Sequence, residues 1–379
     1  METIAKTDAI EVVAFFDLRP SHTPIHEAIL SEIGQLLADG TFTNGPHVAA
    51  FEAAFATWSG AEHCVGLANG LDALRLALIA LGIGPGDEVV VPANTFAATL
   101  EAVIQSGARP VLADASATDY NLDADAARAA VGSATAALLP VHLYGQMADM
   151  VAIAALAAQR GLAVVEDACQ SHGATREGIR AGCAGDAAAF SFYPAKNLGA
   201  FGDAGAFVTS RPELADTVRA LREHGQRRKY HHELIGYTAR LDTLQALVLL
   251  HKLPLLDGWN AEREAMAASY SAALEGIGDL QLPPVADRSR PVWHLYVVRT
   301  ADPEGLGEFL AGRGIGTGRH YPEPPHLMPA FADLGYREGD FPVAEALASE
   351  CLSLPLFPGM TTSQVDRVTE AIAAYFKRG

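Results

Sequence analysis

The sequence has little of what marks a secreted or metal-stabilised protein. Only four of its 379 residues are cysteines, and they form no C-x-x-C pair and no metal-ligand spacing. The absence of such spacings argues against a disulfide framework and against a metal site. We therefore expect mostly buried free thiols at Cys64, Cys169, Cys183 and Cys351, and a cytoplasmic location.

Long apolar runs and an excess of positive charge are missing as well. No apolar stretch reaches the roughly 18 residues that a membrane-spanning helix needs. The start of the chain, with Glu2 and Asp8, lacks the apolar centre of a signal peptide. The net charge of −18 argues against nucleic acid or an anionic membrane as the main partner. A small anionic ligand remains compatible with it, because binding sites are local.

What the sequence does contain, from about residue 25 to 255, is an alternation of short apolar runs with helical patterns. The runs cover 87–92, 108–112, 136–141 and 162–165, and the helical patterns cover 71–81, 96–105, 124–131 and 150–160. Nearly continuous apolar runs are typical of parallel strands that helices cover on both faces. The alternation predicts an α/β fold with a mainly parallel sheet.

The last third of the chain has a different pattern. A long apolar helix is expected over 241–256, leading out of the first domain, and Pro283-Pro284 breaks the chain after it. Residues 292–298 alternate like a strand, and 305–314 and 362–376 have helical patterns. We predict a large domain over 16–255 and a smaller α+β domain over 256–379.

Two segments of the first domain indicate a phosphate-bearing cofactor. Leu67 to Leu74 is a turn of small residues that runs into a helix, where free N–H groups bind phosphate and Gly70 permits close approach. Many α/β turns look like this one. Asp167 follows the run 162–165, at the strand end where α/β proteins place ligands. An aspartate there can pair with a protonated pyridine nitrogen, although it could also cap a helix.

A third segment supplies an amine. Lys196 stands between the run Phe190 to Ala195 and a glycine-rich loop over 199–205. The segment is too apolar for an ordinary surface lysine, and partial burial lowers the pKa of an ammonium group, so that the amine can attack a carbonyl. Ser191 is a second candidate phosphate ligand. The phosphate turn, the aspartate and the lysine follow in that order, which together predicts pyridoxal 5′-phosphate (PLP) as the cofactor.

With these segments in place, the chain resembles the DegT/DnrJ/EryC1/StrS family of sugar aminotransferases, which have the fold-type-I architecture of aspartate aminotransferase. The resemblance runs from about Phe16 to the C-terminus. It includes four further segments, at 43–46, 91–96, 140–145 and 240–246.

The resemblance implies a role for individual residues. Lys196 would be the Schiff-base lysine and proton shuttle, Asp167 the pyridinium partner, and Gln170 the residue against the ring face. The other implied cofactor ligands are Asn69, Gly70, Leu71 and Thr95, with Ser191 opposite. In the family, the segment over 236–240 comes from the other subunit, which implies a homodimer with shared active sites.

Position 238 departs from the family pattern. Relatives usually carry Asn there, and that Asn reaches the neighbour's cofactor phosphate, whereas this chain has Thr238. A hydroxyl still donates one hydrogen bond but is shorter. The alternative is that Thr238 faces the core of its own subunit.

Lys196 also bears on the reaction. The family's sugar dehydratases replace this lysine with histidine, so its presence favours transamination, with L-glutamate as the amino donor and a keto sugar nucleotide as the acceptor. The basic stretch 221–232, with Arg228, Lys229 and Tyr230, resembles the branch that aminates C3, as does 318–322 with His326 following. Its cations could bind the nucleotide diphosphate.

In that branch, positions like Tyr193 and His320 line the hexose site, and we count both among the catalytic residues. The resemblance thus favours conversion of a dTDP-3-keto-6-deoxyhexose to the dTDP-3-amino-3,6-dideoxyhexose. The alternative is a UDP-linked 3-keto-hexuronic acid, whose carboxylate would need a cation such as Arg240. Two further readings are a catalytically silent sensor and a cysteine desulfurase, which requires an exposed, reactive cysteine.

Overall fold

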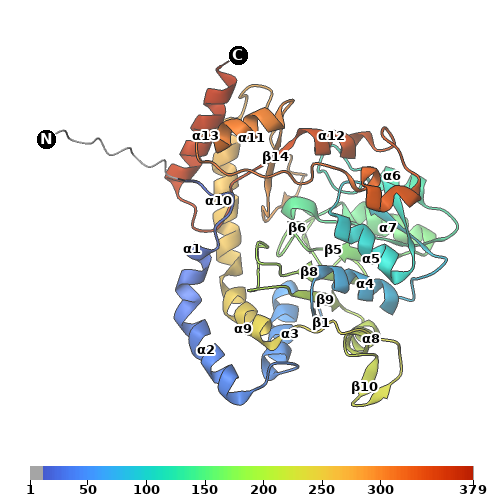
Figure 1. Ribbon diagram of the computed structural model, residues 1–379. Coiled ribbons are helices and arrows are strands. Elements are labelled where there is room, and N and C mark those ends of the chain that lie inside the picture. Colours follow the sequence, from blue (N-terminus) through green and yellow to red (C-terminus); the bar gives the residue numbers. More distant parts are fainter. Residues whose placement is uncertain (1–11, 379) are drawn as a thin grey trace.

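The computed structural model describes residues 12–378 (Figure 1). The segment on which the signal-peptide expectation rests lies outside this range. Within it, no helix combines the length and the apolar character that crossing a membrane requires.

A seven-stranded sheet forms the centre of the molecule, in the order β1-β9-β8-β5-β4-β2-β3. Only β9 runs antiparallel to its neighbours β1 and β8, so the predicted α/β fold with a mainly parallel sheet is confirmed. The strands are β1 (His63–Leu67), β2 (Glu88–Pro92), β3 (Arg109–Ala113), β4 (Thr135–Leu138), β5 (Ala163–Asp167), β8 (Ala187–Ser191) and β9 (Gly205–Thr209).

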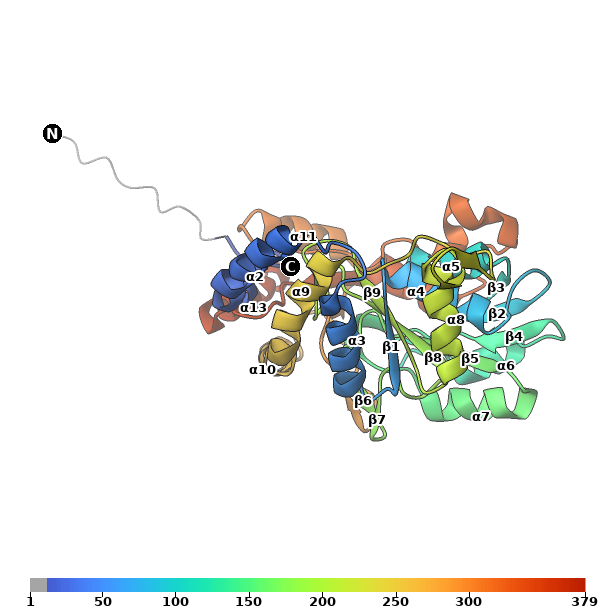
Figure 2. The ribbon, with the colours of Figure 1, turned by 90° about the horizontal axis from the view of Figure 1, so that it is seen from below.

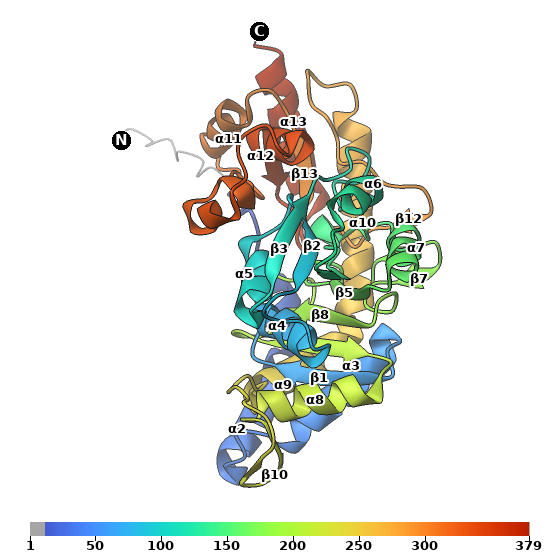
Figure 3. The ribbon, with the colours of Figure 1, turned by 90° about the vertical axis from the view of Figure 1, so that its right-hand side faces the viewer.

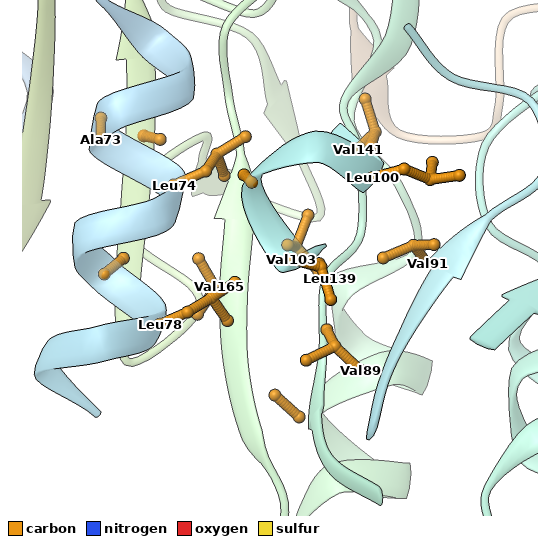
Figure 4. Close-up of a cluster of buried hydrophobic side chains, with 14 of the residues drawn as sticks. Ala73, Leu74, Leu78, Val89, Val91, Leu100, Val103, Leu139, Val141 and Val165 are labelled. Carbon is orange, nitrogen blue, oxygen red and sulfur yellow. The ribbon is translucent and has the colours of Figure 1, made fainter. Parts of the chain in front are cut away.

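Helices cover both faces of this sheet (Figure 2). One face carries α4 (Gly70–Ala80), α5 (Ala97–Ser106) and α8 (Pro212–Arg222), and the other carries α3 (Pro46–Ser59), α6 (Ala124–Ala130) and α7 (Met150–Arg160). Successive strand residues point to opposite faces: Val89 and Val91 pack toward α4 and α5 (Figure 4), whereas Val90 packs toward α6 and α7. Burial on both faces explains the apolar runs of the sequence.

The rest of the chain flanks the sheet, most of it at the β1 end and above, whereas α12 (Pro342–Glu350) lies near α5 (Figure 2). Its other helices are α1 (Arg19–His22), α2 (His26–Asp39), α9 (Thr243–Lys252), α10 (Leu256–Leu274), α11 (Pro303–Ala311) and α13 (Thr362–Phe376). The antiparallel strands β13 (Tyr296–Arg299) and β14 (Cys351–Leu354) pack with α10, α11 and α13 around a third apolar core. Figure 3 shows α10 running along the molecule beside the sheet. Val13, near the start of the described residues, belongs to this third core and forms a parallel β-bridge with Ile315.

Short elements complete the fold. A three-stranded sheet contains β12 (Ser289–Arg290), β6 (Thr175–Arg176) and β7 (Ile179–Arg180), and a hairpin contains β10 (Gln226–Arg228) and β11 (His231–His232). Five 3-10 turns lie at Thr23–Ile25, Leu143–Gly145, Leu253–Leu255, Pro325–Leu327 and Pro329–Leu334. Phe331 and Phe341, near the last turn and α12, pack into the core beside α4 and α5.

Three expectations need correction. The helix expected over 241–256 is α9 followed by a 3-10 turn at Pro254, after which α10 continues the helical path. The strand expected over 292–298 begins only at Tyr296, because the N–H groups of Val292 and Leu295 donate to carbonyls of Gly145 and Tyr144 instead. All four thiols are free, but just Cys64 and Cys351 are buried.

Candidate active site

A cavity of about 730 Å³ opens at the carboxyl ends of the parallel strands. Asp167 ends β5, Ser191 ends β8, and Asn69 follows β1, so the sheet itself brings three distant segments together. Ten of the predicted site residues line this cavity: Asn69, Gly70, Leu71, Thr95, Asp167, Gln170, Ser191, Tyr193, Lys196 and His320.

The first wall of the cavity is the N-terminus of α4. The side chain of Asn69 caps the helix by accepting from the N–H of Asp72 at 2.7 Å. The N–H groups of Gly70 and Leu71 have no partner within the helix, as is usual for a first turn. A Cβ at Gly70 would lie 2.8 Å from Cβ of Ser191 and 2.7 Å from Sγ of Cys169. Glycine is therefore required for the start of α4 to pack this closely against Cys169 and Ser191.

Asp167 is held in a fixed orientation in the cavity wall. The hydroxyl of Thr99 donates to its Oδ2 at 2.9 Å, and Thr99 is in turn 2.8 Å from the hydroxyl of Thr95. The N–H of Cys169 donates to Oδ1 at 3.2 Å. No helix follows Asp167, so the helix-cap alternative is wrong. The carboxylate points into the cavity with one hydrogen-bond donor on each oxygen.

Lys196 lies in a tight loop after β8. Its N–H donates to the Tyr193 carbonyl at 2.8 Å, and a Cβ at Gly199 would be 2.2 Å from the Pro194 carbonyl oxygen. Burial lowers the pKa of Lys196, which Asp167 and Cys169 oppose in part. The lysine also borders a chamber of about 20 Å³ on its far side. The amine is thus brought closer to its neutral, nucleophilic form.

Three histidines surround the lysine without adding positive charge. Burial and the charge of Lys196 lower the pKa of His172 to about 3 and that of His320 to about 4. The same causes hold the pKa of His294 well below its usual value. Nδ1 of His320 is 2.8 Å from the hydroxyl of Ser353, and its ring stacks on Phe15. All three imidazoles are therefore neutral near pH 7.

Gln170 is fixed at both ends of its amide. Its Oε1 accepts from the N–H of Tyr144 at 2.8 Å, and its Nε2 donates to the hydroxyl of Tyr321 at 3.1 Å. Tyr321 packs against Phe96, whose ring is 53% exposed at the cavity mouth. Two aromatic side chains and one oriented amide thus border the space between Asp167 and Lys196.

Five predicted residues lie outside the cavity of their own chain: Thr238, Arg228, Lys229, Tyr230 and Arg240. Arg228, Lys229 and Tyr230 are exposed on the β10–β11 hairpin, at the bottom of Figures 1 and 3. Arg240 donates to Glu223 at 2.8 Å. Thr238 is exposed, with its hydroxyl 3.2 Å from Nε2 of His224. The alternative that Thr238 faces its own core is therefore wrong.

The structure also adds residues that the sequence did not single out. Thr99, Tyr321, His294 and Arg263 line the cavity. Thr99 lies in the first turn of α5 and Thr95 just before that helix, so no helical spacing in the sequence singles Thr99 out. Arg263 and His294 lie far along the chain in segments without a local motif. Cys169 also lines the cavity, but burial raises the pKa of its thiol well above the usual value, which disfavours the desulfurase reading.

A mainly parallel seven-stranded sheet that helices cover on both faces, with the cavity at its strand ends, is the architecture of a fold-type-I aminotransferase. The chain belongs to the DegT/DnrJ/EryC1/StrS aminotransferase family, whose sequence model matches residues 24–373.

Named relatives match over nearly their whole length. The dTDP-3-amino-3,4,6-trideoxy-alpha-D-glucose transaminase of Streptomyces venezuelae is 46% identical, with 97% of both chains covered. The dTDP-3-amino-3,6-dideoxy-alpha-D-galactopyranose transaminase of Aneurinibacillus thermoaerophilus is 43% identical, with 96% of this chain and 99% of the relative covered. The crystal structure of S. venezuelae DesV in complex with a ketimine intermediate superimposes with a TM-score of 0.95, covering 97% of this chain and 99% of DesV.

Proposed function

We propose that this chain is a PLP-dependent aminotransferase that converts a dTDP-3-keto-6-deoxyhexose to the dTDP-3-amino-3,6-dideoxyhexose, with L-glutamate as the amino donor. The observation that carries the proposal is the placement of Lys196 and Asp167 in one cavity, which the start of α4 and the exposed aromatic side chains of Phe96 and Tyr193 also line. Its four free thiols agree with a cytoplasmic enzyme.

The residues present fit PLP. A phosphate would lie at the N-terminus of α4, where Asn69, Gly70, Leu71 and Ser191 line the cavity and the first N–H groups of the helix have no partner within it. Asp167, oriented by Thr99, would pair with the ring nitrogen. When bound, PLP supplies an electron sink that stabilises negative charge on the carbon attached to the amino group.

The chain's own residues then handle the proton. Nζ of Lys196 would hold the cofactor through its carbonyl carbon, leave it when an amino substrate arrives, and move a proton from the substrate carbon to the cofactor carbon. Burial assists because it lowers the pKa of the amine, which favours the neutral form that can accept a proton. Neutral His320 and Tyr193 would border the hexose on the other side of Lys196.

The dTDP-linked substrate is favoured over the UDP-linked hexuronic acid. The two named relatives reported above are transaminases of dTDP sugars. Arg240, which the hexuronate alternative needs as a free cation, pairs with Glu223, and Asn44 binds the same carboxylate at 3.0 Å. This pairing argues against Arg240 as the free cation for a sugar carboxylate.

We also propose a homodimer with shared active sites. Thr238, Arg228, Lys229 and Tyr230 are exposed and stand outside their own cavity, as residues that serve a neighbour's site must. Exposed apolar side chains accompany them, with Ile235 at 93% and Tyr230 at 83% exposure. Such side chains are typical of a surface that another subunit covers.

A panel of 3-keto and 4-keto sugars, each linked to dTDP or UDP, tests the proposal. Purified enzyme with PLP and L-glutamate should form 2-oxoglutarate fastest with the dTDP-3-keto-6-deoxyhexose. A higher kcat/KM with a UDP-linked or 4-keto sugar would contradict the substrate. Absence of turnover, together with no conversion of PLP by glutamate, would contradict the function itself.

A further inference from the structure

A buried tyrosine contacts three separate segments of the active-site wall. Among the residues that the structure describes, Tyr144 does not itself line the cavity. Its N–H donates to the side chain of Gln170, its carbonyl accepts from the N–H of Leu295 at 3.3 Å, and its hydroxyl donates to the carbonyl of His320. These three partners all line the cavity. One residue thus joins parts of the wall that lie far apart in the sequence.

The contacts of Tyr144 close a ring of hydrogen bonds. The side chain of Gln170 accepts from the Tyr144 N–H at 2.8 Å and donates to the hydroxyl of Tyr321 at 3.1 Å. Tyr321 directly follows His320, whose carbonyl accepts from the Tyr144 hydroxyl. The ring joins Gln170, which we assign to the cofactor, to His320, which we assign to the hexose. Each of these two residues is therefore held relative to the other through Tyr144.

The carbonyl of His320 depends on the tyrosine hydroxyl. Gly318 forms two backbone hydrogen bonds with Ser353, but within residues 12–378 no backbone N–H donates to the carbonyl of His320. The imidazole is held by the Ser353 hydroxyl and by stacking on Phe15. Burial raises the pKa of the Tyr144 hydroxyl well above its usual value, so the hydroxyl keeps the proton that it donates. Without the hydroxyl, the His320 backbone would lose a fixed contact.

The backbone of Tyr144 supports the same interpretation. Its φ of 58° and ψ of 6° lie in the left-handed region, which residues other than glycine rarely adopt. The next residue, Gly145, has a φ of 100°, and a Cβ there would lie 2.7 Å from the backbone nitrogen of His294. Such conformations persist where the surrounding contacts fix them, and they concentrate at functional sites. A glycine at position 144 would relieve the backbone but would provide no hydroxyl for His320.

Resting on the proposed function, we propose that Tyr144 is a positioning residue for the half-reaction in which the keto sugar nucleotide takes the amino group. Its hydroxyl holds the His320 carbonyl and thereby keeps the imidazole against the hexose. Its backbone N–H, which does not depend on the side chain, holds Gln170 at the cofactor. L-Glutamate has no hexose, so the half-reaction that loads the amino group requires only the backbone contact. Loss of the hydroxyl therefore separates the two half-reactions.

Tyr144→Phe tests this role, because it removes the hydroxyl and keeps the ring and the N–H. The KM of the keto sugar nucleotide with pyridoxamine phosphate (PMP)-loaded enzyme should increase roughly 3- to 10-fold, the effect of one hydrogen bond. Conversion of PLP by L-glutamate and the absorbance of the PLP form should not change. Tyr296→Phe is the matched control: this buried tyrosine, with its hydroxyl 2.9 Å from that of Ser271, lies in the third core and should affect neither half-reaction.

Binding without turnover gives a second readout. By calorimetry, dTDP-D-glucose, a dTDP-hexose without a keto group, should bind PMP-loaded Tyr144→Phe roughly 3- to 10-fold more weakly than PMP-loaded wild type. dTDP alone, which has no hexose, should bind both equally. In a His320→Ala background, Tyr144→Phe should have no further effect on the binding of dTDP-D-glucose, because the hydroxyl acts through His320.

Four results would each overturn the inference. They are equal loss of both half-reactions in Tyr144→Phe, equal weakening of dTDP and dTDP-D-glucose, additive effects of Tyr144→Phe and His320→Ala, and the same division between half-reactions in Tyr296→Phe. Failure of the proposed function is distinct from these results, since wild-type enzyme would then not convert PLP with L-glutamate, or would bind dTDP-D-glucose no more tightly than dTDP.

Discussion

The hydroxyl of Thr99 donates a 2.9 Å hydrogen bond to Oδ2 of Asp167, and this contact orients the carboxylate that we assign to the cofactor ring. Thr99 comes from α5 and Asp167 from the end of β5, so a helix of one face of the sheet fixes a side chain at the strand ends. The packing of α5 on the sheet would therefore influence the protonation of the ring nitrogen of the proposed cofactor.

We expect Asp167→Asn to lower kcat by several orders of magnitude, because a neutral partner does not keep the ring nitrogen protonated. Thr99→Val should cost about tenfold in kcat through a less well-oriented carboxylate. Steady-state turnover at equal PLP content measures both effects. Thr99→Ser, which keeps the hydroxyl, is the matched control, and near wild-type turnover of Asp167→Asn would refute the assigned role.

Lys196→Ala should abolish turnover while the protein still folds, because the variant lacks the amine that moves the proton. Borohydride reduction of the wild-type holoenzyme followed by peptide mapping identifies the lysine concerned. We expect a phosphopyridoxyl group on Lys196. A label on Lys252, the buried lysine of α9, would show that the wrong amine had been chosen.

Thr238→Asn should slow the loss of PLP during dialysis and leave turnover roughly intact. The amide extends further than the hydroxyl and brings two donors, and one more hydrogen bond to a charged phosphate is worth roughly 1.5–3 kcal/mol. Thr238→Val, which removes the hydroxyl now 3.2 Å from His224, should release PLP faster. Faster loss of PLP from the Asn variant would argue against a shared active site.

Lys252 should make the free energy of unfolding depend on pH in the alkaline range. It is 2% exposed, its Nζ donates to the Gly199 carbonyl and lies 3.3 Å from His22, and burial lowers its pKa to about 8. The unfolded chain binds more protons at this site between pH 8 and its ordinary pKa of about 10.4, so the free energy of unfolding rises with pH across that window. The gain is up to about 3 kcal/mol.

Lys252→Met should remove this rise, as urea unfolding at several pH values would measure. The free energy of unfolding of the wild type should therefore increase relative to that of the variant as the pH increases from 8 to 10. The exposed Lys377→Met is the control and should leave the pH dependence unchanged. Parallel curves for wild type and Lys252→Met would contradict the assignment.

Local pattern predicted much of this architecture. The helices α7 and α13 match the sequence expectation at both ends, since apolar spacing and, for α13, a capping box at Thr361 and Gln364 define them. The strand β13 was placed too early because Val292 and Leu295 bond to another loop, a tertiary contact that alternation does not encode. Helix α10 continues beyond Pro254 because a 3-10 turn accommodates the proline at its start.

The site divides in the same way. Lys196, Asp167 and Gly70 stand in local motifs, and the sheet brings them to one cavity as expected. Arg263 reaches the cavity only because α10 passes behind Lys196, and His294 only because its loop is tied to Tyr144 and Gly145. Neither has a neighbouring residue that signals its use. Contacts between segments so far apart in the sequence can be found only in a three-dimensional structure.

The two spaces beside Lys196 differ greatly in size, about 730 Å³ against about 20 Å³, and just the larger one has room for a substrate. The amino acid and the sugar nucleotide must therefore use the same space in turn, and the keto acid has to depart before the sugar enters. Double-reciprocal plots should be parallel, and 2-oxoglutarate should compete with the keto sugar. In a cell rich in glutamate, the enzyme would then wait in its aminated form, and supply of the keto sugar would set the flux.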